Sequence, residues 1–408
     1  MHQYRRVLAS LRLRGWASTW RRIAQALARP HAPGPDPTAT GHLHFEPGNG
    51  PRMLVVDASA PDPTRDSGSL RMHSLLELLR EEGWRIDFFA DDGAAAPADT
   101  KRLADIGVAL RNENIVRWLR SEGRELHTVL LSRAPIADQY QALVRKLAPT
   151  ARIVFDTVDL HFLREKRGAD LMQSPALRRH ADATLRRELS LIRASDLCLV
   201  VSSEEQRILA ELAPRSRVEL LSNIHRVHGR NADYEERRDL LFVGGFSHPP
   251  NLDAMKWFIA EVLPIVRERI PDVSLHIVGD LTPQASAELQ GTGVRLHGRV
   301  ENLDPYMDGC RLSVAPLRFG AGVKGKVNMA MSYGLPVVLT PVAAEGMHLT
   351  DGEEALIAES PEDFAAAILR VYREPALWSR LSDAGLRNIQ QHFSVDVARR
   401  QVQRLFAH

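Results

Sequence analysis

The sequence of 408 residues is poor in cysteine, with only Cys198 and Cys310. So few cysteines exclude a disulfide-rich scaffold and a cysteine-rich zinc module. Both stand among apolar residues, so we expect two small, buried side chains. No apolar run approaches the roughly 20 residues that cross a bilayer, which argues against an integral membrane protein.

The overall charge is also small. The chain has 53 Lys and Arg against 51 Asp and Glu, a formal net charge of +2, which argues against a general nucleic-acid-binding protein. With 44% hydrophobic and 25% charged residues, the chain is able to bury ordinary cores, so wholesale disorder is excluded. At roughly 150 residues per domain, the length predicts two or three domains.

The positive charge is concentrated at the N-terminus. Residues 1–30 contain seven arginines and no acidic residue, which leaves 46 basic against 51 acidic residues in the rest of the chain. An apolar stripe at helical spacing runs through this segment and consists of Leu13, Trp16, Trp20, Ile23 and Leu27. An arginine-rich amphipathic helix suits an anionic membrane surface as its partner. Packing of the helix on the body of the protein, or a transit peptide, would explain the same composition.

A proline-rich stretch follows this basic segment. Six prolines fall between residues 30 and 51, and proline both fixes φ and removes a backbone donor. We therefore interpret residues 1–51 as a basic helix and a tether, and expect the globular body to begin near residue 52.

Short apolar runs then alternate with amphipathic helical patterns, which is typical of parallel sheets covered on both faces. The strands expected in the first half are 53–58, 85–90, 128–133, 152–156, 197–202 and 218–221. Those expected in the second half are 240–244, 274–278, 294–296, 312–316, 336–340 and 355–358, with helices such as 253–269 and 361–373 between them. The sequence predicts an α/β protein with two doubly wound, Rossmann-like domains whose ligand-binding edges face each other across a cleft. We place the domains at 52–224 and 240–375, with a linker at 225–239 and C-terminal helices at 376–408.

The sharpest local pattern lies between the expected strand 312–316 and the following helix. It combines three glycines with two lysines, at Gly320, Gly322, Gly325, Lys324 and Lys326. Glycine lets backbone N–H groups approach a phosphate, and a helix start adds positive potential. The lysines add two cations, so the segment indicates a diphosphate ligand.

Two other interpretations account for part of this pattern. The glycines also satisfy G-x-G-x-x-G, and Glu345 lies about 20 residues beyond Gly325, where a dinucleotide fold places its ribose-binding acid. However, Glu345 stands five residues past the expected strand 336–340 rather than at its end. A tight turn would explain the glycines but not the lysines.

Across residues 52–395 the chain resembles family 4 glycosyltransferases of the GT-B fold. The segments that carry the resemblance are 54–57 with 66–71, 156–164, 242–251, the glycine-lysine loop, 334–338, 344–346 and Phe393-Ser394. The resemblance implies that residues 54–164 belong to the acceptor domain and residues 242–346 to the donor domain. It also implies that a final helix returns to the first domain.

Two departures from the family pattern stand out. Many members carry two glutamates with seven residues between them, and the matching positions here hold Ala321 and Met329. Members also often place a basic pair after the first donor-domain strand, whereas residues 245–251 contain no Lys or Arg. The charge of a leaving diphosphate would then rest mainly on Lys324, Lys326 and backbone N–H groups.

The resemblance also implies a set of site residues. On the donor side they are Gly244, Gly245, Phe246, His248, Asn251, Arg299, Val300, Gly320, Ala321, Gly322, Val323, Gly325, Asn328, Met329 and Glu345. On the acceptor side they are Asp66, Ser67, Gly68, Arg71 and Asp156. We expect Lys324, Lys326, Asp159 and His161 to act in the chemistry. For Asp156 and Asp159, helix capping is the structural alternative.

The function implied is transfer of a sugar from a nucleotide-sugar to a glycan or lipid-linked acceptor, with retention, in surface or cell-envelope polysaccharide synthesis. The nucleotide-sugar is a co-substrate and no cofactor is expected. The absence of a D-x-D pattern predicts metal independence, and no nucleic-acid partner is expected. We expect a cytoplasmic protein, peripheral at the inner face of the membrane if residues 1–30 bind there. A catalytically silent binding or scaffold protein with the same fold is the alternative, since Ala321 and Met329 replace carboxylates. A dinucleotide-dependent oxidoreductase is the third.

Overall fold

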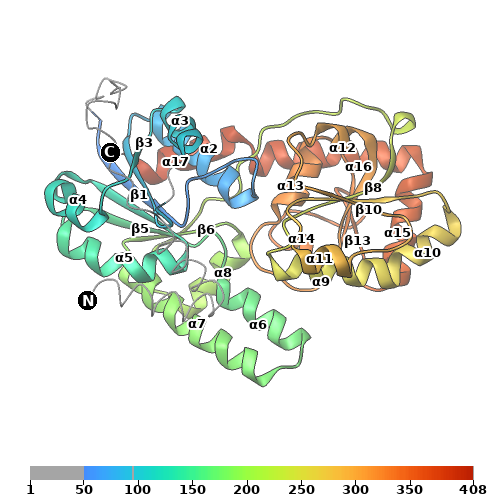
Figure 1. The fold of residues 1–408 in the computed structure, drawn as a ribbon, viewed down its shortest axis with the longest axis horizontal. Helices are drawn as coiled ribbons and strands as arrows, with labels where there is room; N and C mark the ends of the chain where they lie inside the picture. The colour runs from blue at the N-terminus through green and yellow to red at the C-terminus, as the bar shows by residue number, and fades with distance from the viewer. Residues whose placement is uncertain (1–49, 94–95, 408) are drawn as a thin grey trace.

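Two α/β lobes lie side by side in the computed structural model, which describes residues 50–93 and 96–407 (Figure 1). The predicted basic helix within residues 1–30 and nearly all of the tether lie outside the described residues. In the described part, each lobe is built around its own parallel sheet.

The first lobe contains a seven-stranded sheet in the order β3-β2-β1-β4-β5-β6-β7. Its strands are β1 (Arg52–Asp57), β2 (Arg85–Ala90), β3 (Ala109–Arg111), β4 (Thr128–Ser132), β5 (Arg152–Asp156), β6 (Leu197–Val200) and β7 (Val218–Leu220). Its helices are α2 (Ser67–Glu81), α3 (Pro97–Asp105), α4 (Ile115–Glu122), α5 (Ala134–Leu147), α6 (His161–Leu171), α7 (Pro175–Ala194) and α8 (Ser203–Leu212). The expectation of six strands in this half was wrong. The additional strand, β3, is a half-buried edge strand of three residues and has no apolar run that would reveal it.

The second lobe contains a six-stranded sheet in the order β10-β9-β8-β11-β12-β13. Its strands are β8 (Arg238–Val243), β9 (Leu275–Val278), β10 (Val294–Gly298), β11 (Cys310–Ala315), β12 (Val337–Leu339) and β13 (Leu356–Ile357). Its helices are α9 (Pro249–Trp257), α10 (Leu263–Arg269), α11 (Pro283–Glu288), α12 (Asp304–Gly309), α13 (Gly325–Ser332), α14 (Pro341–Ala344), α15 (Pro361–Arg373) and α16 (Pro375–Asn388). The helix expected at 253–269 is present but starts at Pro249, and a π-helical turn at Phe258–Val262 separates α9 from α10.

Two segments of chain connect the lobes and lie against each other. One runs from the end of β7 to the start of β8, and the other leads from α16 into the final helix, α17 (Val395–Phe406). The backbone N–H of His225 in the first donates to the Phe393 carbonyl in the second at 2.8 Å. Helix α17 then packs Val402 and Phe406 into the core of the first lobe, so the chain ends on the domain where the described part begins (Figure 1).

Both cysteines are free and buried, as the sequence predicts. None of the helices in the described part of the chain is long and apolar enough to cross a membrane.

A buried ion pair anchors the first connection to the sheet of the first lobe. The guanidinium of Arg71, on α2, donates to both carboxylate oxygens of Asp156 at 2.7 and 3.0 Å. It also donates to the carbonyls of Leu221 and Ser222, where the connection begins. Arg71 and Asp156 are 1% and 0% exposed, so each charge depends on the other for its stability.

We expect Arg71→Met to lower the free energy of unfolding by about 3–5 kcal/mol, because it leaves the Asp156 carboxylate buried without a counter-ion. Urea denaturation followed by circular dichroism measures this loss. Arg207→Met is the matched control, since Arg207 pairs with Glu204 and Glu211 at the surface and its loss should leave the urea midpoint unchanged. Equal midpoints for the two variants would contradict the structural role of the buried pair.

Candidate functional site

The glycine-lysine loop follows β11 and ends where α13 begins at Gly325. It lies directly against the first lobe. A Cβ atom on Gly322 would be 3.2 Å from Cβ of Asp159, and one on Gly325 would be 2.2 Å from Cβ of Ser67. Gly322 also has a positive φ of 67°. The glycines are therefore needed for contact between the lobes, in addition to any role at a phosphate.

At the start of α13, Lys324 is buried and Lys326 is partly buried. The ammonium group of Lys324 donates to the Gly322 carbonyl at 2.5 Å and to the Ala321 carbonyl at 3.4 Å. The ammonium group of Lys326 donates to Oδ1 of Asn251 at 2.5 Å and lies 4.2 Å from the centre of the Phe242 ring. Within the described residues, neither lysine forms an ion pair with a carboxylate.

Burial makes both ammonium groups unusually acidic. It lowers the pKa of Lys324 to about 8, although the charges of Glu345 and Glu205 partly oppose the shift. Burial, together with the nearby charge of Lys324, lowers the pKa of Lys326 to about 7. A site that holds two cations without a carboxylate paired to either is suited to a ligand that brings negative charge.

The loop after β8 covers Lys326. Nδ2 of Asn251 donates to the Gly245 carbonyl at 2.7 Å, while a Cβ on Gly244 would lie 3.1 Å from Nζ of Lys326. Phe246 is buried in the core of the second lobe. His248 precedes α9, and burial followed by the charges of Arg164 and Lys326 lowers its pKa to about 4.

The acceptor-side residues Asp159 and His161 stand at the start of α6 and contact each other. Nε2 of His161 lies 3.3 Å from Oδ1 of Asp159, and Arg164 donates to Oδ2 of the same carboxylate. Burial alone would raise the pKa of Asp159, but Arg164 and His161 outweigh it and hold that pKa well below its usual range. The pKa of His161 is raised, because the attraction of Asp159 exceeds the opposing effect of burial. Neither Asp156 nor Asp159 caps α6, whose cap residue is Leu160.

Two buried carboxylates hold this segment in place. Glu188 accepts hydrogen bonds from the backbone N–H groups of His161 and Phe162, at 3.1 and 2.9 Å. Glu205 accepts from the N–H groups of Leu160 and Val201. Burial raises the pKa of each carboxyl to about 7. The backbone around Asp159 and His161 is therefore fixed by carboxylates from α7 and α8.

An ion pair joins the lobes at Glu345. Both carboxylate oxygens of Glu345 accept from the guanidinium of Arg167, at 2.5 and 2.6 Å, and Arg167 also donates to the Gly320 carbonyl at 2.8 Å. Glu345 is thus engaged by α6 of the first lobe, which weakens its interpretation as the ribose-binding acid of a dinucleotide fold.

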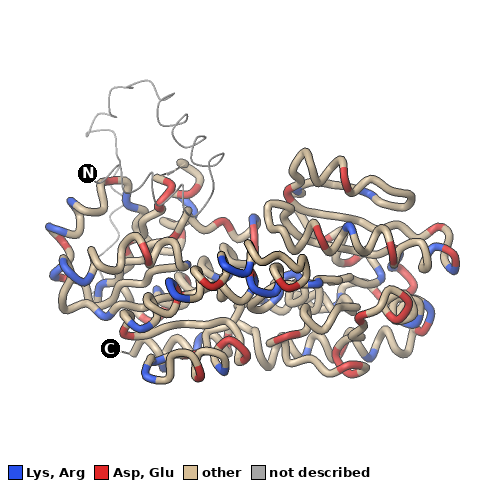
Figure 2. The backbone as a smooth tube through the Cα atoms, turned by 90° about the horizontal axis from the view of Figure 1, so that it is seen from below, with Lys and Arg blue, Asp and Glu red and all other residues tan. Residues whose placement is uncertain are grey.

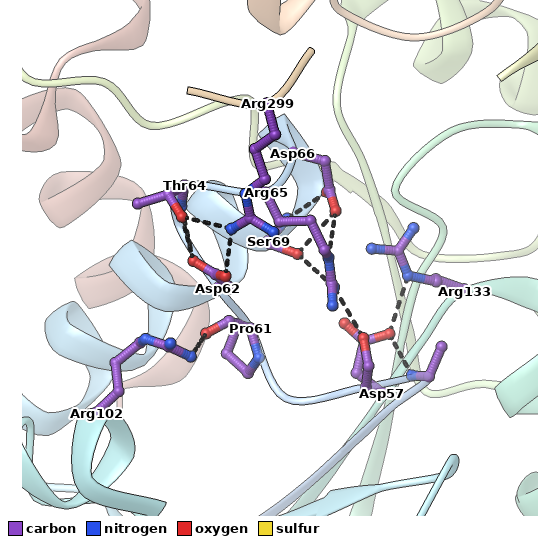
Figure 3. Close-up of polar contacts among 12 residues, drawn as sticks. Asp57, Pro61, Asp62, Thr64, Arg65, Asp66, Ser69, Arg102, Arg133 and Arg299 are labelled. Atoms are coloured by element: carbon purple, nitrogen blue, oxygen red, sulfur yellow. Dashed lines mark hydrogen bonds and ion pairs between the residues drawn. The ribbon is translucent and has the colours of Figure 1, made fainter. Parts of the chain in front are cut away.

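Arg299, which follows β10, forms another ion pair between the lobes. Its guanidinium donates to Oδ2 of Asp62 and to Oγ1 of Thr64, both at 2.9 Å (Figure 3). Figure 3 shows this arginine reaching the loop between β1 and α2. The following residue, Val300, packs partly buried against the core of the second lobe.

Asp66, Ser67 and Gly68 form the start of α2. Asp66 caps the helix by accepting from the Ser69 N–H at 2.8 Å. A Cβ on Gly68 would lie 2.9 Å from the guanidinium of Arg133, which itself donates to Asp57 at the end of β1 (Figure 3). By contrast, the side chains of Arg71 and Asp156 are buried in the pair described above.

The remaining donor-side residues lie in or near α13. Asn328 is fully buried, and its Oδ1 accepts from Nδ2 of Asn223 in the connection between the lobes at 3.0 Å. Val323 and Met329 pack against the core of the second lobe. Ala321 contributes its carbonyl to Lys324.

Four residues of this site are not among those predicted from the sequence: Arg164, Arg167, Glu188 and Glu205. Arg164 and Arg167 follow His161 at intervals of three, which places all three on one face of α6, and that spacing is visible in the sequence. Glu188 and Glu205 come from distant helices and carry no local pattern. Among the described residues, no group of three or more His, Cys, Asp or Glu side chains is arranged to hold a metal ion, and metal independence stays a prediction.

Comparisons with known proteins bear on this geometry. A family model described as "Glycosyl transferases group 1" matches residues 237–374. An "uncharacterized 44.6 kDa protein in cps region" of Klebsiella pneumoniae is 33% identical over 140 residues, which are 32% of this chain and 36% of that protein. The alignment therefore spans about a third of the length of this curated relative.

Solved structures match over most of the chain. Sucrose-phosphate synthase from Thermosynechococcus elongatus has a TM-score of 0.64 at 16% identity, covering 87% of this chain and 98% of its own. Anabaena Alr3699/HepE in complex with UDP and glucose has a TM-score of 0.67 at 13% identity, covering 88% and 100%. The two Rossmann-like lobes therefore form a GT-B fold, as the sequence predicts, and residues 237–374 carry the similarity to group 1 glycosyltransferases.

We expect Gly325→Ala to destabilise the protein by about 1–3 kcal/mol, because the added methyl group would overlap Ser67 and force α13 away from α2. The melting temperature measures the effect. The double variant Ser67→Gly/Gly325→Ala lacks the opposing Cβ atom. Its melting temperature should therefore be close to that of Ser67→Gly alone.

Gly309→Ala is the control for this pair, since a Cβ there would have no neighbour within 4 Å. Failure of Ser67→Gly to rescue Gly325→Ala would show that the close packing of α13 on α2 is not what requires a glycine at this position.

Proposed function

We propose that the protein is a glycosyltransferase that moves a sugar from a nucleoside-diphosphate sugar to a glycan or lipid-linked acceptor. The observation that carries this proposal is the pair of lysines at the start of α13, one buried and one partly buried, which form no ion pair within the described residues. The similarity of residues 237–374 to group 1 glycosyltransferases supports it. The complex of Alr3699/HepE with UDP and glucose makes uridine diphosphate sugars the first donors to test.

In this proposal the diphosphate of the donor binds between the start of α13 and the loop after β8. Negative charge grows on the diphosphate as the bond to the anomeric carbon breaks, and donors aimed at such charge are usually the largest catalytic contribution. Lys324 and Lys326 supply that stabilisation by exchanging the Gly322 carbonyl and the Asn251 amide oxygen for phosphate oxygens. The first-turn amides of α13 add to it, since helix N-termini attract anions.

Across the interface, Asp159 and His161 orient the attacking hydroxyl group of the acceptor. Their backbone is fixed by Glu188 and Glu205, which suits a group that must hold a substrate in one geometry. We propose retention of anomeric configuration, no metal requirement, and a role in surface polysaccharide synthesis. The relative from a cps region supports the last point. Residues 1–30 are proposed to bind an anionic membrane surface from the cytoplasmic side.

Lys324→Ala should reduce sugar transfer by a factor of about a hundred or more, as expected for the loss of one donor to a developing anion. Release of nucleoside diphosphate from UDP-sugars measures the rate. Lys256→Ala is the matched control, because this lysine lies at the surface with Glu288. Equal rates for wild type and Lys324→Ala would remove Lys324 from the mechanism.

The low pKa values of the two lysines predict pH-dependent binding of a nucleoside diphosphate. In the free protein the pKa values of Lys326 and Lys324 are about 7 and about 8. Because bound diphosphate raises both values, the affinity should be highest below about pH 7 and should fall as the pH rises through them. Calorimetry at pH 8 in buffers of different ionisation enthalpy should show proton uptake on binding. Lys326→Met should reduce that uptake, and binding without any proton uptake would count against a diphosphate on these lysines.

The same assays separate the competing functions. Because Ala321 and Met329 replace two carboxylates common in similar enzymes, a silent binding protein is the second candidate. Binding of a nucleoside diphosphate without donor hydrolysis or transfer to any acceptor would favour it. Binding of NAD alone would favour the oxidoreductase and contradict both.

A further inference from the structure

Helices α6 and α7 form a hairpin that extends away from the sheet of the first lobe (Figure 1). Its turn lies between Leu171, the last residue of α6, and Pro175, the first residue of α7. We call residues 171–179 the hairpin tip. Every residue of the tip except Ser174 is exposed.

The tip carries most of the exposed apolar side chains found in the described part of the chain. Five large hydrophobic residues are exposed in the described part of the chain. Three of them belong to the tip: Leu171 at 40%, Met172 at 55% and Leu177 at 41%. The other two, Leu212 and Val227, lie outside the hairpin. A local cluster of exposed apolar side chains marks a surface that meets a partner.

The hairpin as a whole is basic, although Asp170 and Asp182 lie beside the arginines near its tip. In the hairpin, residues 161–194, the exposed basic residues are Lys166, Arg178, Arg179, Arg186 and Arg193. The only exposed acidic residues of the hairpin are Asp170 and Asp182. Figure 2 views the molecule from this side. The excess of basic residues in the hairpin contrasts with the chain beyond residue 30, which has more acidic than basic residues.

A polar hollow lies beside the apolar side chains. It is lined in part by Ser174, Arg178 and Arg179, together with Asp170 and Asp182. Arg178 pairs with Asp170 at 2.5 Å, whereas no ion pair of Arg179 is present in the described structure. The tip therefore combines aliphatic side chains on a convex turn with arginines at their base.

We propose that the hairpin tip docks on the surface of an anionic lipid bilayer. Aliphatic side chains flanked by arginines suit the boundary between headgroups and acyl chains, where apolar area and attraction to anionic lipids add together. Leu171, Met172 and Leu177 insert among the headgroups, and Arg178 and Arg179 contact their phosphates. This surface is separate from residues 1–30, so it provides a second point of attachment.

Docking at the tip would set the height of the acceptor side above the membrane. Helix α6 runs from His161 to Leu171, so its 11 residues place the tip about 16 Å from the start of the helix at a rise of about 1.5 Å per residue. A lipid-linked acceptor could therefore present its sugar near Asp159 and His161. This consequence rests on the proposed function, whereas docking itself does not.

The test measures binding of the full-length protein to vesicles of phosphatidylcholine, with and without phosphatidylglycerol, by co-sedimentation. The variant L171Q/M172Q/L177Q should bind the anionic vesicles about tenfold more weakly or worse, because it removes the inserted apolar groups. The variant L212Q/V227Q is the matched control and should bind like wild type. Since residues 1–30 are present in every protein, their contribution is the same throughout.

The electrostatic part has its own variant. R178Q/R179Q should weaken binding to anionic vesicles by about tenfold or more at low salt, and leave binding to pure phosphatidylcholine unchanged. All these positions are exposed, so the melting temperature should not move. Hydrolysis of UDP-sugar by the tip variants should also match wild type, which separates failure of the docking from failure of the proposed activity.

Two results would overturn the proposal. One is equal binding of wild type and L171Q/M172Q/L177Q to anionic vesicles. The other is a change in the sedimentation coefficient of the tip variants without a change in vesicle binding, which would identify the tip as an interface between proteins.

Discussion

The candidate site depends on two ammonium groups, that of Lys324, which is buried, and that of Lys326, which is partly buried, and neither is paired with a carboxylate in the described chain. Removing a cation from water is costly, and it is usually offset by a partner or by loss of the proton. Here the partners are a carbonyl and an amide oxygen, and the pKa values fall to about 8 and about 7. The protein therefore holds an electrostatic imbalance that a diphosphate would correct. The position of α13, the loop after β8 and the contact between the lobes all serve to keep these lysines where they are.

The contact between the lobes is made by small residues in its centre and by ion pairs around it. Gly322 and Gly325 let the loop approach the first lobe closely, while Arg167 with Glu345 and Arg299 with Asp62 connect the lobes by charge. Such exposed or half-exposed ion pairs add little to stability on their own. They do fix the orientation in which the two lobes meet, and they release readily in water, so the same contacts are compatible with opening to admit a substrate.

Much of the fold follows from the sequence, because long apolar strands and amphipathic helices alternate along it. The glycine-lysine loop is equally visible, since glycines and lysines stand together between a strand and a helix. The edge strand β3 has no such pattern, and the buried carboxylates Glu188 and Glu205 only acquire a role when distant helices meet. Arg71 and Asp156 look like site residues in the sequence because they follow the expected motifs, yet the structure buries both as a pair. Tertiary packing decides these cases, and local sequence does not encode it.

The most direct measurement is a crystal structure of the protein with a bound nucleoside diphosphate. We expect oxygens of the β-phosphate to lie within hydrogen-bond distance of the ammonium groups of Lys324 and Lys326, with Asn251 released from Lys326. A diphosphate bound elsewhere, with Lys326 still donating to Asn251 and Lys324 to the Gly322 carbonyl, would contradict the central claim.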